Sequence, residues 1–416
     1  MIKTIGCQIN VCNSEIISDM LVNNGFFEVK NPEEANIFIL NTCSIRSSAE
    51  QKAFSYLGRL EILKMKNKKL KIFVIGCMAE RLGNIIKQRF KTVNLVIGNK
   101  DVKYVIFKIV SSFQHIDTKN TLVSNNKIVN YIKIMTGCNN YCTYCIVPFV
   151  CGNEHSFNFN TILNRCSMLV RRGTKKIILL GQNVNSYKYG NVDFTMLLKQ
   201  IARINGVERI SFMTNHPKDF NIDLINIISN EPKICTNIHI PMQSASDRIL
   251  KKMNRKYTYS NYIKLIDNLR SAIPNINITT DIIVGFPTET SMDFKKTLNA
   301  VQTIKFSKVY AFKYSPRPNT LSYNMIDDVT PLEKKERLKV ILKESNKISV
   351  EILSKMIGSV QEVLTEDIIG DTIKATTRCG YKVFIKTLDN KYNYLGKQLN
   401  VKIKTVKINS LIAEII

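Results

Sequence analysis

The stretch Gly137-Cys138-Asn139-Asn140-Tyr141-Cys142-Thr143-Tyr144-Cys145 places three cysteines in the spacing C-x3-C-x2-C, directly after a predicted strand over residues 131–135. Thiolates are the usual protein ligands of iron–sulfur clusters. Three thiolates this close in sequence hold three irons of a cubane cluster and leave the fourth iron open to a small molecule, by the logic of an open position on catalytic zinc. A structural zinc site is the alternative, because Cys151 follows this stretch and would supply a fourth thiolate.

Three further cysteines stand at or just after the ends of separate predicted strands. They are Cys7, Cys43 and Cys77, which follow residues 2–6, 37–40 and 72–76. Because the carboxyl ends of parallel strands share one edge of a sheet, these thiols are expected to converge, and the helices that begin nearby would stabilise the thiolates. The pattern indicates a second metal or cluster site with one open position. The alternative is that these cysteines are small core residues.

Predicted strands and helices alternate through most of the chain, which is typical of parallel sheets covered by helices. We therefore expect an α/β protein with an N-terminal parallel α/β domain over residues 1–115, a central partial (βα)6 barrel over 125–355 and a C-terminal small β-barrel over 357–416. The tail is expected to hold short antiparallel strands of the oligonucleotide-binding type. The predicted central strands are residues 131–135, 176–180, 209–213, 237–241, 277–284 and 308–314.

The composition is that of a globular protein, with 44% hydrophobic and 22% charged residues among 416. No apolar run reaches the roughly 18 residues that a membrane helix needs, and the N-terminus lacks the apolar stretch of a secretory signal. A cytoplasmic protein without a membrane segment is expected. The net charge of +27 indicates a polyanionic partner, most plausibly nucleic acid. A composition rich in Lys, Ile and Asn would raise the charge without such binding.

Several motifs resemble the MiaB-type branch of the radical S-adenosylmethionine methylthiotransferases, and the resemblance covers essentially the whole chain. The runs that contain Cys43 and Gln182 favour this type over relatives that act on threonylcarbamoyl-adenosine or on a ribosomal protein. Besides the C-x3-C-x2-C loop, the motifs are Gly6-Cys7-Gln8-Ile9-Asn10, Asn41-Thr42-Cys43-Ser44-Ile45-Arg46, Gly76-Cys77-Met78-Ala79-Glu80-Arg81, Leu180-Gly181-Gln182-Asn183-Val184-Asn185-Ser186-Tyr187, His239-Ile240-Pro241-Met242-Gln243-Ser244 and Asp281-Ile282-Ile283-Val284-Gly285-Phe286-Pro287.

The resemblance implies S-adenosylmethionine and two 4Fe–4S clusters as cofactors. A 5′-deoxyadenosyl radical would abstract hydrogen from C2 of an adenine, and the auxiliary cluster would supply the sulfur that a second S-adenosylmethionine methylates. The implied activity is methylthiolation of N6-isopentenyladenosine at position 37 of tRNA, beside the anticodon. The alternatives are the same reaction on N6-threonylcarbamoyladenosine, and an iron–sulfur RNA-binding protein whose catalysis has decayed. The implied ligands are Cys7, Cys43 and Cys77 for the auxiliary cluster and Cys138, Cys142 and Cys145 for the radical cluster.

The resemblance also implies supporting residues. We expect Tyr144, Gln182 and Asn183 to contact S-adenosylmethionine, and His239 and Gln243 to contact substrate. The alternatives are a plain surface aromatic at Tyr144 and polar side chains that satisfy one another at His239 and Gln243.

The implied partners follow from the same family. The C-terminal barrel would be a TRAM domain that contacts the anticodon stem-loop of tRNA, with basic clusters contributing phosphate contacts. Further expected partners are a one-electron reductant protein and iron–sulfur assembly factors, and the chain itself is expected to be a monomer. The basic clusters are Lys64, Lys66, Lys68, Lys69 and Lys71, and Lys251, Lys252, Arg255 and Lys256.

The chain departs from the family pattern beside the C-x3-C-x2-C loop. Cys151 and Phe157 stand where the family has arginines. Losing two fixed cations is not a conservative change, because an arginine fork binds carboxylate or phosphate bidentately. Asn215 replaces a serine before His216, and Ala245 replaces a glycine. None of these changes touches the six expected ligands.

Overall fold

The computed structural model describes the chain except for residues 46, 100, 114–126 and 387–390. Arg46 of the expected family motif therefore lies outside the described residues. The chain divides into two compact units, each described separately below. The first unit comprises Met1–Asn125, Thr136–Asn139 and Cys145–Glu154, and the second comprises Asn126–Met135, Asn140–Tyr144 and His155–Ile416. The short strands β6 (Met135–Thr136) and β7 (His155–Ser156) lie near the positions where the chain passes from one unit to the other.

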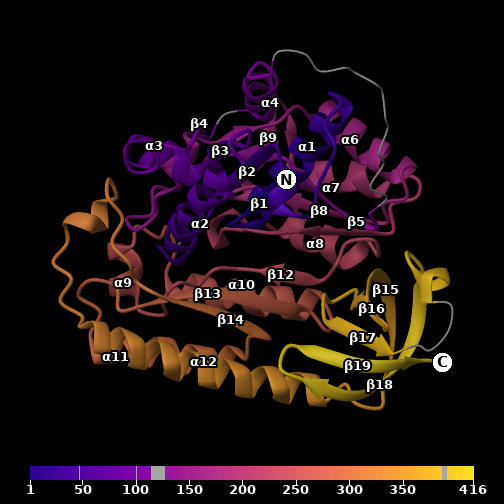
Figure 1. Ribbon diagram of the computed structural model, residues 1–416. Helices are drawn as coiled ribbons and strands as arrows, with labels where there is room; N and C mark the ends of the chain where they lie inside the picture. Colours follow the sequence, from indigo (N-terminus) through magenta and orange to yellow (C-terminus); the bar gives the residue numbers. More distant parts are fainter. Residues whose placement is uncertain (46, 100, 114–126, 387–390) are drawn as a thin grey trace. The chain divides into compact units, whose positions relative to one another are not determined.

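The first unit contains a four-stranded parallel sheet in the order β1-β2-β3-β4 (Figure 1). The parallel pairing and the alternation with helices confirm the predicted α/β character. The strands are β1 (Ile2–Thr4), β2 (Ile37–Thr42), β3 (Lys71–Gly76) and β4 (Leu95–Ile97). The helices are α1 (Gln8–Asn23), η1 (Pro32–Glu34), α2 (Ser47–Lys66), α3 (Cys77–Arg89), α4 (Val102–Val110) and α5 (Val147–Cys151).

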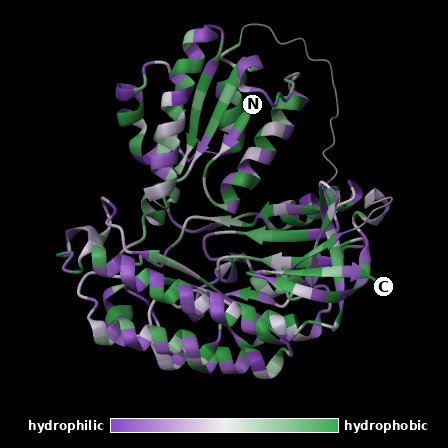
Figure 2. Cartoon of the chain, turned by 60° about the horizontal axis from the view of Figure 1, so that its bottom comes forward, coloured by the Kyte–Doolittle hydropathy of each residue, from purple (hydrophilic) through white to green (hydrophobic). Residues whose placement is uncertain are grey.

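Helices cover both faces of this sheet because successive strand residues point to opposite sides. On β2, Phe38 and Leu40 join one core with residues of α2 and α3, whereas Ile37 and Ile39 join the other with residues of α1 and α4. A strand buried on both faces reads as a continuous apolar run. Figure 2 shows the strands of this sheet mostly green, as that burial requires.

The first helix begins directly after the first of the three strand-end cysteines. Helix α1 starts at Gln8 with Cys7 as its N-cap residue, and Cys12 is a buried residue within it. The side chain of Asn10 donates a hydrogen bond of 2.8 Å to the carbonyl oxygen of Thr42. Asn10 is therefore a buried residue that links α1 to β2, although polar side chains are more often exposed.

The second unit contains six parallel strands in two three-stranded sheets, β5-β8-β11 and β12-β13-β14. An isolated parallel bridge between Ile210 and Ile234 links the end of the first set to the segment before β12. The six predicted central strands are confirmed, each with bounds within two residues of the observed ones. The strands are β5 (Val129–Lys133), β8 (Lys176–Leu180), β11 (Arg209–Phe212), β12 (Asn237–His239), β13 (Asn277–Val284) and β14 (Lys308–Lys313).

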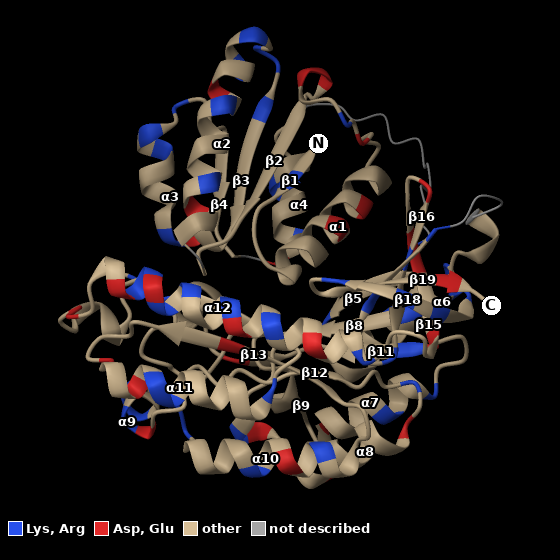
Figure 3. Cartoon of the chain, turned by 90° about the horizontal axis from the view of Figure 1, so that it is seen from below, with Lys and Arg blue, Asp and Glu red and all other residues tan. Residues whose placement is uncertain are grey.

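Helices cover these strands, and one large apolar core fills the space between the two layers. Basic and acidic residues alternate with others along helix α12, as the blue and red segments of Figure 3 show. The helices are α6 (Phe159–Arg171), α7 (Phe194–Ala202), α8 (Ile222–Asn230), α9 (Asp247–Lys252), α10 (Tyr259–Ala272), α11 (Ser291–Ile304) and α12 (Pro331–Ser354). The smaller elements are η2 (Val184–Ser186), β9 (Lys188–Tyr189), β10 (Val192–Asp193), η3 (Pro217–Asp219) and η4 (Leu321–Asn324).

The tail forms a closed barrel in the order β15-β16-β17-β19-β18, with an interior of alternating apolar residues. The prediction of a small barrel is confirmed, but an entirely antiparallel barrel was wrong, because β17 and β19 pair in parallel. A ring with an odd number of strands cannot alternate direction at every step, so one parallel pair is unavoidable. The elements are β15 (Val360–Ile369), β16 (Thr372–Thr377), β17 (Lys382–Lys386), η5 (Lys391–Tyr394), β18 (Gln398–Lys407) and β19 (Ser410–Ile415). Among the described helices of the whole chain, none has the length and apolar composition of a membrane span.

A buried ion pair attaches the barrel to the parallel strands of the same unit. Lys176 at the start of β8 lies 2.8 Å from the Glu366 carboxylate, and their side chains are 7% and 9% exposed. The hydroxyl of Thr376 also contacts both partners. Next to this pair, Arg209 at the start of β11 bonds to Glu362 at 3.2 Å.

We expect Lys176→Met to lower the free energy of unfolding by about 3–5 kcal/mol, because it leaves the Glu366 carboxylate buried without its paired cation and with the Thr376 hydroxyl as its remaining donor. Lys175→Met is the matched control: its pair with Glu208 is 36% and 27% exposed, and such pairs contribute about 0–1 kcal/mol. Urea unfolding followed by circular dichroism measures both losses, since the chain has no tryptophan. Equal losses in the two variants would contradict the importance of the buried pair.

Candidate functional site

Three thiols gather at the carboxyl edge of the first unit's sheet, as their positions after separate strands predicted. Cys7 precedes α1, Cys43 directly follows β2, and Cys77 is the first residue of α3. Cys43 bonds to Cys7, and this contact lowers the pKa of Cys7 to about 6 against the opposing effect of burial. The same contact, then burial and the charge on Cys77, raise the pKa of Cys43. The three thiols thus act on one another electrostatically.

Two glycines allow the strand ends to come this close. A Cβ atom on Gly6 would lie 2.7 Å from the Cβ atom of Cys43. Gly76 has a φ of +93°, and a Cβ atom there would lie 2.5 Å from the carbonyl oxygen of Thr42. L-residues with side chains rarely adopt such a φ, so glycine is required immediately before Cys77.

Buried polar side chains fix the geometry of this edge. The amide of Asn41 donates to the backbone oxygen of Asn10 and to the Ser14 hydroxyl, both at 2.9 Å. The hydroxyl of Thr42 donates to the carbonyl oxygen of Ile75 at 2.6 Å. These bonds tie α1, β2 and β3 together directly beneath the thiols.

A second polar group holds the loop after Cys43. The Ser44 hydroxyl donates to Glu50 at 2.5 Å, and Arg81 of α3 pairs with the same carboxylate oxygen at 2.5 Å. Arg81 also donates to the Ser44 hydroxyl at 3.2 Å. The arginine that ends the Gly76–Arg81 motif therefore positions the neighbour of one expected ligand.

Cys151 lies beside Cys77 in the first unit. The two residues share a small apolar cluster with Ile146, the N-cap residue of α5, and Val150 within it. Contact with Cys151, followed by burial, raises the pKa of Cys77. Among the described residues, no group of three or more Cys, His, Asp or Glu residues is arranged to hold a metal ion. A cubane cluster spreads its ligands more widely than one ion does, since its own irons and sulfides stand between them.

The C-x3-C-x2-C loop is divided between the two units. Cys138 and Cys145 belong to the first and Cys142 to the second. In the first unit the Cys138 amide donates to the carbonyl oxygen of Gly152 at 3.2 Å. A Cβ atom on Gly137, whose φ is +73°, would overlap the backbone of Asn153, so the residue before Cys138 must be glycine.

In the second unit, the turn after α9 holds the middle of this loop. The Thr143 amide donates to Met253 at 3.1 Å and its hydroxyl donates to Lys252 at 2.8 Å. The Asn254 amide donates to the carbonyl oxygen of Tyr141 at 2.9 Å. Arg255 then directs one guanidinium nitrogen at the Cys142 sulfur, 3.4 Å away.

Arg255 is therefore not a surface cation of the predicted basic cluster. Its residue exposure is 8%, whereas Lys251 and Lys256 on either side are exposed. Burial lowers the pKa of Arg255, but Tyr257, Tyr144 and Cys142 raise it by more, so the pKa stands well above its usual value. The prediction that Arg255 is available to phosphate was wrong, because spacing along a turn does not tell which side chain points inward.

Polar residues with buried side-chain oxygens lie just after the ends of several parallel strands in the second unit. The side-chain oxygens of Asn183, Asn215 and Gln243 are buried and lack a hydrogen-bond partner within the described part of the chain. These residues follow β8, β11 and β12. Each such oxygen carries a desolvation cost unless a ligand or water donates to it, so this edge is prepared to receive hydrogen-bond donors.

The other expected contact residues have defined surroundings. Tyr144 packs against an apolar cluster that includes Met253 and Phe286. Gln182 lies two residues after the end of β8 at Leu180 and is half-buried. His239 bonds to the Thr279 hydroxyl at 2.9 Å and lies 3.3 Å from the Asp281 carboxylate. Asp281 opens one of the motifs quoted above, but its contact with His239 was not predicted.

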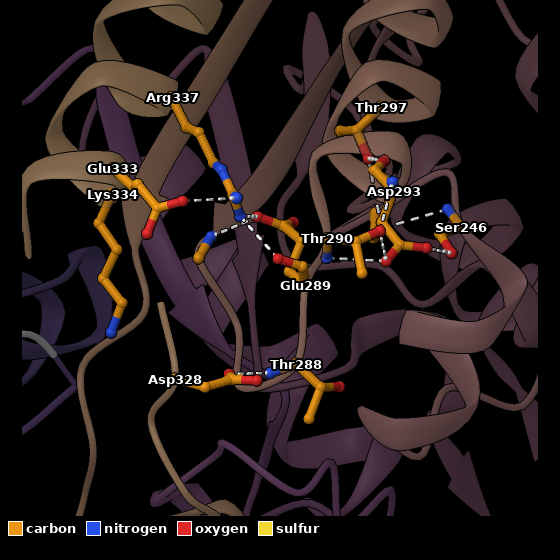
Figure 4. Close-up of polar contacts among 12 residues, drawn as sticks. Ser246, Thr288, Glu289, Thr290, Asp293, Thr297, Asp328, Glu333, Lys334 and Arg337 are labelled. Carbon is orange, nitrogen blue, oxygen red and sulfur yellow. Dashed lines mark hydrogen bonds and ion pairs between the residues drawn. The ribbon is translucent and has the colours of Figure 1, made fainter. Parts of the chain in front are cut away.

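A polar network also fixes the loop that follows β13 (Figure 4). Asp293 accepts hydrogen bonds of 2.6 Å from the hydroxyls of Ser246 and Thr290. Burial raises the pKa of Asp293, but bonds from Arg248 and these hydroxyls lower it by more, so the carboxylate stays charged. Nearby, Glu289 pairs with Arg337 of α12 at 2.8 Å.

At the two positions where arginines were expected, the structure gives different surroundings. Phe157 packs against the main core, with the Lys133 ammonium 5.3 Å from its ring centroid. A cation thus remains beside this position in the second unit. The Cys151 thiol contacts Cys77 instead of supplying a charge.

Comparison with known proteins adds independent evidence. Residues 132–301 match the Radical SAM superfamily, and residues 1–98 match the uncharacterized protein family UPF0004. A radical S-adenosylmethionine methyltransferase from Kitasatospora setae, TsrM, has a similar fold, with a TM-score of 0.53, 11% identity and coverage of 87% of this chain and 71% of that one.

Curated relatives match the whole chain. The tRNA-2-methylthio-N(6)-dimethylallyladenosine synthase of Endomicrobium trichonymphae is 56% identical, over 100% of this chain and 99% of that protein. The protein of the same name from Thermodesulfovibrio yellowstonii is 42% identical, over 100% and 98%. The chain therefore belongs to the family of tRNA-2-methylthio-N(6)-dimethylallyladenosine synthases, the MiaB-type radical S-adenosylmethionine methylthiotransferases.

Proposed function

We propose that this chain methylthiolates C2 of N6-isopentenyladenosine at position 37 of tRNA, beside the anticodon. The observation that carries the proposal is the gathering of Cys7, Cys43 and Cys77 at one sheet edge in a chain 56% identical to a synthase with this name. Because tRNA is the proposed substrate, the cytoplasm is the proposed location. We also keep as proposals the three domains over 1–115, 125–355 and 357–416, and a monomeric state.

The proposed cofactors are S-adenosylmethionine and two 4Fe–4S clusters. The donor sets fit: each is three cysteines, the ligand type that iron–sulfur clusters take, and each leaves one iron without a protein ligand. When bound, these groups would supply the radical chemistry, the sulfur and the methyl group. Cys7, Cys43 and Cys77 would hold the auxiliary cluster, and Cys138, Cys142 and Cys145 the radical cluster.

The protein's own residues bind and orient these groups. The unsatisfied oxygens of Asn183 and Gln243 would accept hydrogen bonds from amino or hydroxyl groups of cofactor or substrate. Tyr144 and Gln182 are proposed to complete the cofactor pocket, and His239, held by Asp281, is proposed to face the substrate. A base splayed from the anticodon loop would reach these groups, as single-stranded RNA permits.

Binding of tRNA is supported by the net charge of +27 and by the closed C-terminal barrel. Phosphate contacts from lysines would make the affinity fall as salt rises. A one-electron reductant protein and iron–sulfur assembly factors remain proposed partners, because two clusters must be built and one must be reduced.

The decisive test is nucleoside mass spectrometry of tRNA from cells that lack their own methylthiotransferase. We expect methylthio-isopentenyladenosine when the intact chain is expressed and none with Cys142→Ala, since that change removes a radical-cluster ligand. Cys166→Ala is the matched control, because Cys166 is buried on α6 in the apolar core of the second unit and belongs to neither proposed ligand set. The threonylcarbamoyl product would move the assignment to the sister reaction. No product from soluble, iron-loaded protein would favour an RNA-binding protein without catalysis.

We expect the triple change Cys7→Ala, Cys43→Ala and Cys77→Ala to lower iron and sulfide from about eight to about four atoms of each per chain, as the loss of one 4Fe–4S cluster requires. The measurement is iron and acid-labile sulfide after anaerobic reconstitution. Cys12→Ala is the control, since Cys12 lies in the same unit within α1. An unchanged iron content in the triple variant would refute the auxiliary ligand set.

A further inference from the structure

The contact between Arg255 and Cys142 joins a fixed cation to an expected cluster ligand. One guanidinium nitrogen lies 3.4 Å from the Cys142 sulfur. A second donates to the carbonyl oxygen of Pro241 at 3.2 Å, and the third bonds to the Tyr257 hydroxyl at 3.0 Å. All three nitrogens of the fork are thus engaged, so the orientation of the group is fixed.

A purely structural role does not account for a buried arginine here. Removing a guanidinium from water is costly unless an opposite charge compensates it. No carboxylate of the described residues pairs with Arg255; its partners are a carbonyl, a phenol and a thiol sulfur. Among these partners, the Cys142 sulfur is the one that becomes negatively charged when it ligates a cluster, so the ligand sulfur and the cluster would supply the compensating charge.

A cation at a ligand sulfur has a defined effect on an iron–sulfur cluster. The reduction potential depends on net charge and on hydrogen bonds to the sulfurs. The reduced cluster carries one more negative charge than the oxidised one, so a buried cation stabilises the reduced state more. Low solvent exposure strengthens this effect, because the local dielectric constant is below that of water.

We propose that Arg255 is a positioning residue that raises the reduction potential of the cluster held through Cys142, and so eases the one-electron reduction that starts the reaction. The inference rests on the proposed function, since it takes Cys142 as a ligand of the radical cluster. It gives the turn after α9 a role beyond anchoring the loop: the segment from Lys252 to Arg255 fixes both the backbone of the loop and the charge beside its sulfur.

The test is a redox titration of the full chain with the auxiliary ligands Cys7, Cys43 and Cys77 changed to alanine, so that one cluster titrates. Electron paramagnetic resonance reports the reduced cluster against a dithionite-poised mediator series without S-adenosylmethionine. With Arg255→Met we expect the ratio of reduced to oxidised cluster at a fixed potential to fall about tenfold, or about 59 mV for a one-electron couple. Arg255→Lys keeps the positive charge but lacks the planar fork of the guanidinium. Its reduction potential should lie between those of the parent and Arg255→Met.

Two matched controls separate charge from loosening of the loop. Lys256→Met removes the same charge from an exposed neighbour, and Asn254→Ala removes an anchor of the loop at Tyr141 without touching the sulfur. Both should leave the potential unchanged. An equal shift in either control, or an unchanged potential in Arg255→Met, would overturn the inference while leaving the proposed function intact.

Loss of the cluster is also informative. If Arg255→Met and Arg255→Lys both failed to hold a cluster that the parent holds, Arg255 would be needed for cluster binding, and the proposed effect on potential would be refuted. A parent chain with no cluster signal would instead refute the assignment of Cys138, Cys142 and Cys145, and the inference would fall with it.

Discussion

The parallel pairing of β1, β2 and β3 is the constraint on which the rest of the first unit depends. Parallel strands bring their carboxyl ends to one edge, so Cys7, Cys43 and Cys77 meet although long helices separate them in sequence. Gly6 and Gly76 allow the backbone at this edge to pack closely, and the hydrogen bonds of Asn41 and Thr42 hold α1, β2 and β3 together there. In the second unit the same constraint places Asn183, Asn215 and Gln243 after the ends of parallel strands. Their buried side-chain oxygens have no hydrogen-bond donor among the described residues.

The departures from the family pattern acquire a physical meaning in this arrangement. Phe157 keeps a cation close through Lys133, which lies over its ring. Cys151 brings a fourth thiol to the neighbourhood of Cys77, where the family pattern has a permanent positive charge. At Phe157 the ammonium group of Lys133 still supplies a nearby positive charge. At Cys151 a charged group is replaced by a thiol, which can be oxidised.

Sequence reasoning predicted the strands well because continuous apolar runs and flanking polar breaks are local signals. It also placed the cysteines at strand ends, since that inference needs only strand bounds and the parallel rule. It took Arg255 for a surface cation and did not predict the contacts of Asp281 or Glu50, because their partners are distant in sequence and no periodic pattern marks them. The burial of Asn10 was not predicted for the same reason: this residue of α1 bonds to Thr42 of β2, which its residue type does not reveal. The parallel pair β17–β19 follows from the closure of the ring, a property of the whole barrel.

The rigid attachment of the tail has a consequence for how an RNA would be read. Lys176 and Arg209 fasten β15 and β16 to the first residues of core strands β8 and β11, so the barrel does not swing on a tether. The opposite ends of these core strands lead to the unsatisfied oxygens. If the barrel binds RNA, as proposed, it would hold that RNA at a set distance from those oxygens. The target nucleotide would then be selected partly by its distance along the folded RNA from the bound part.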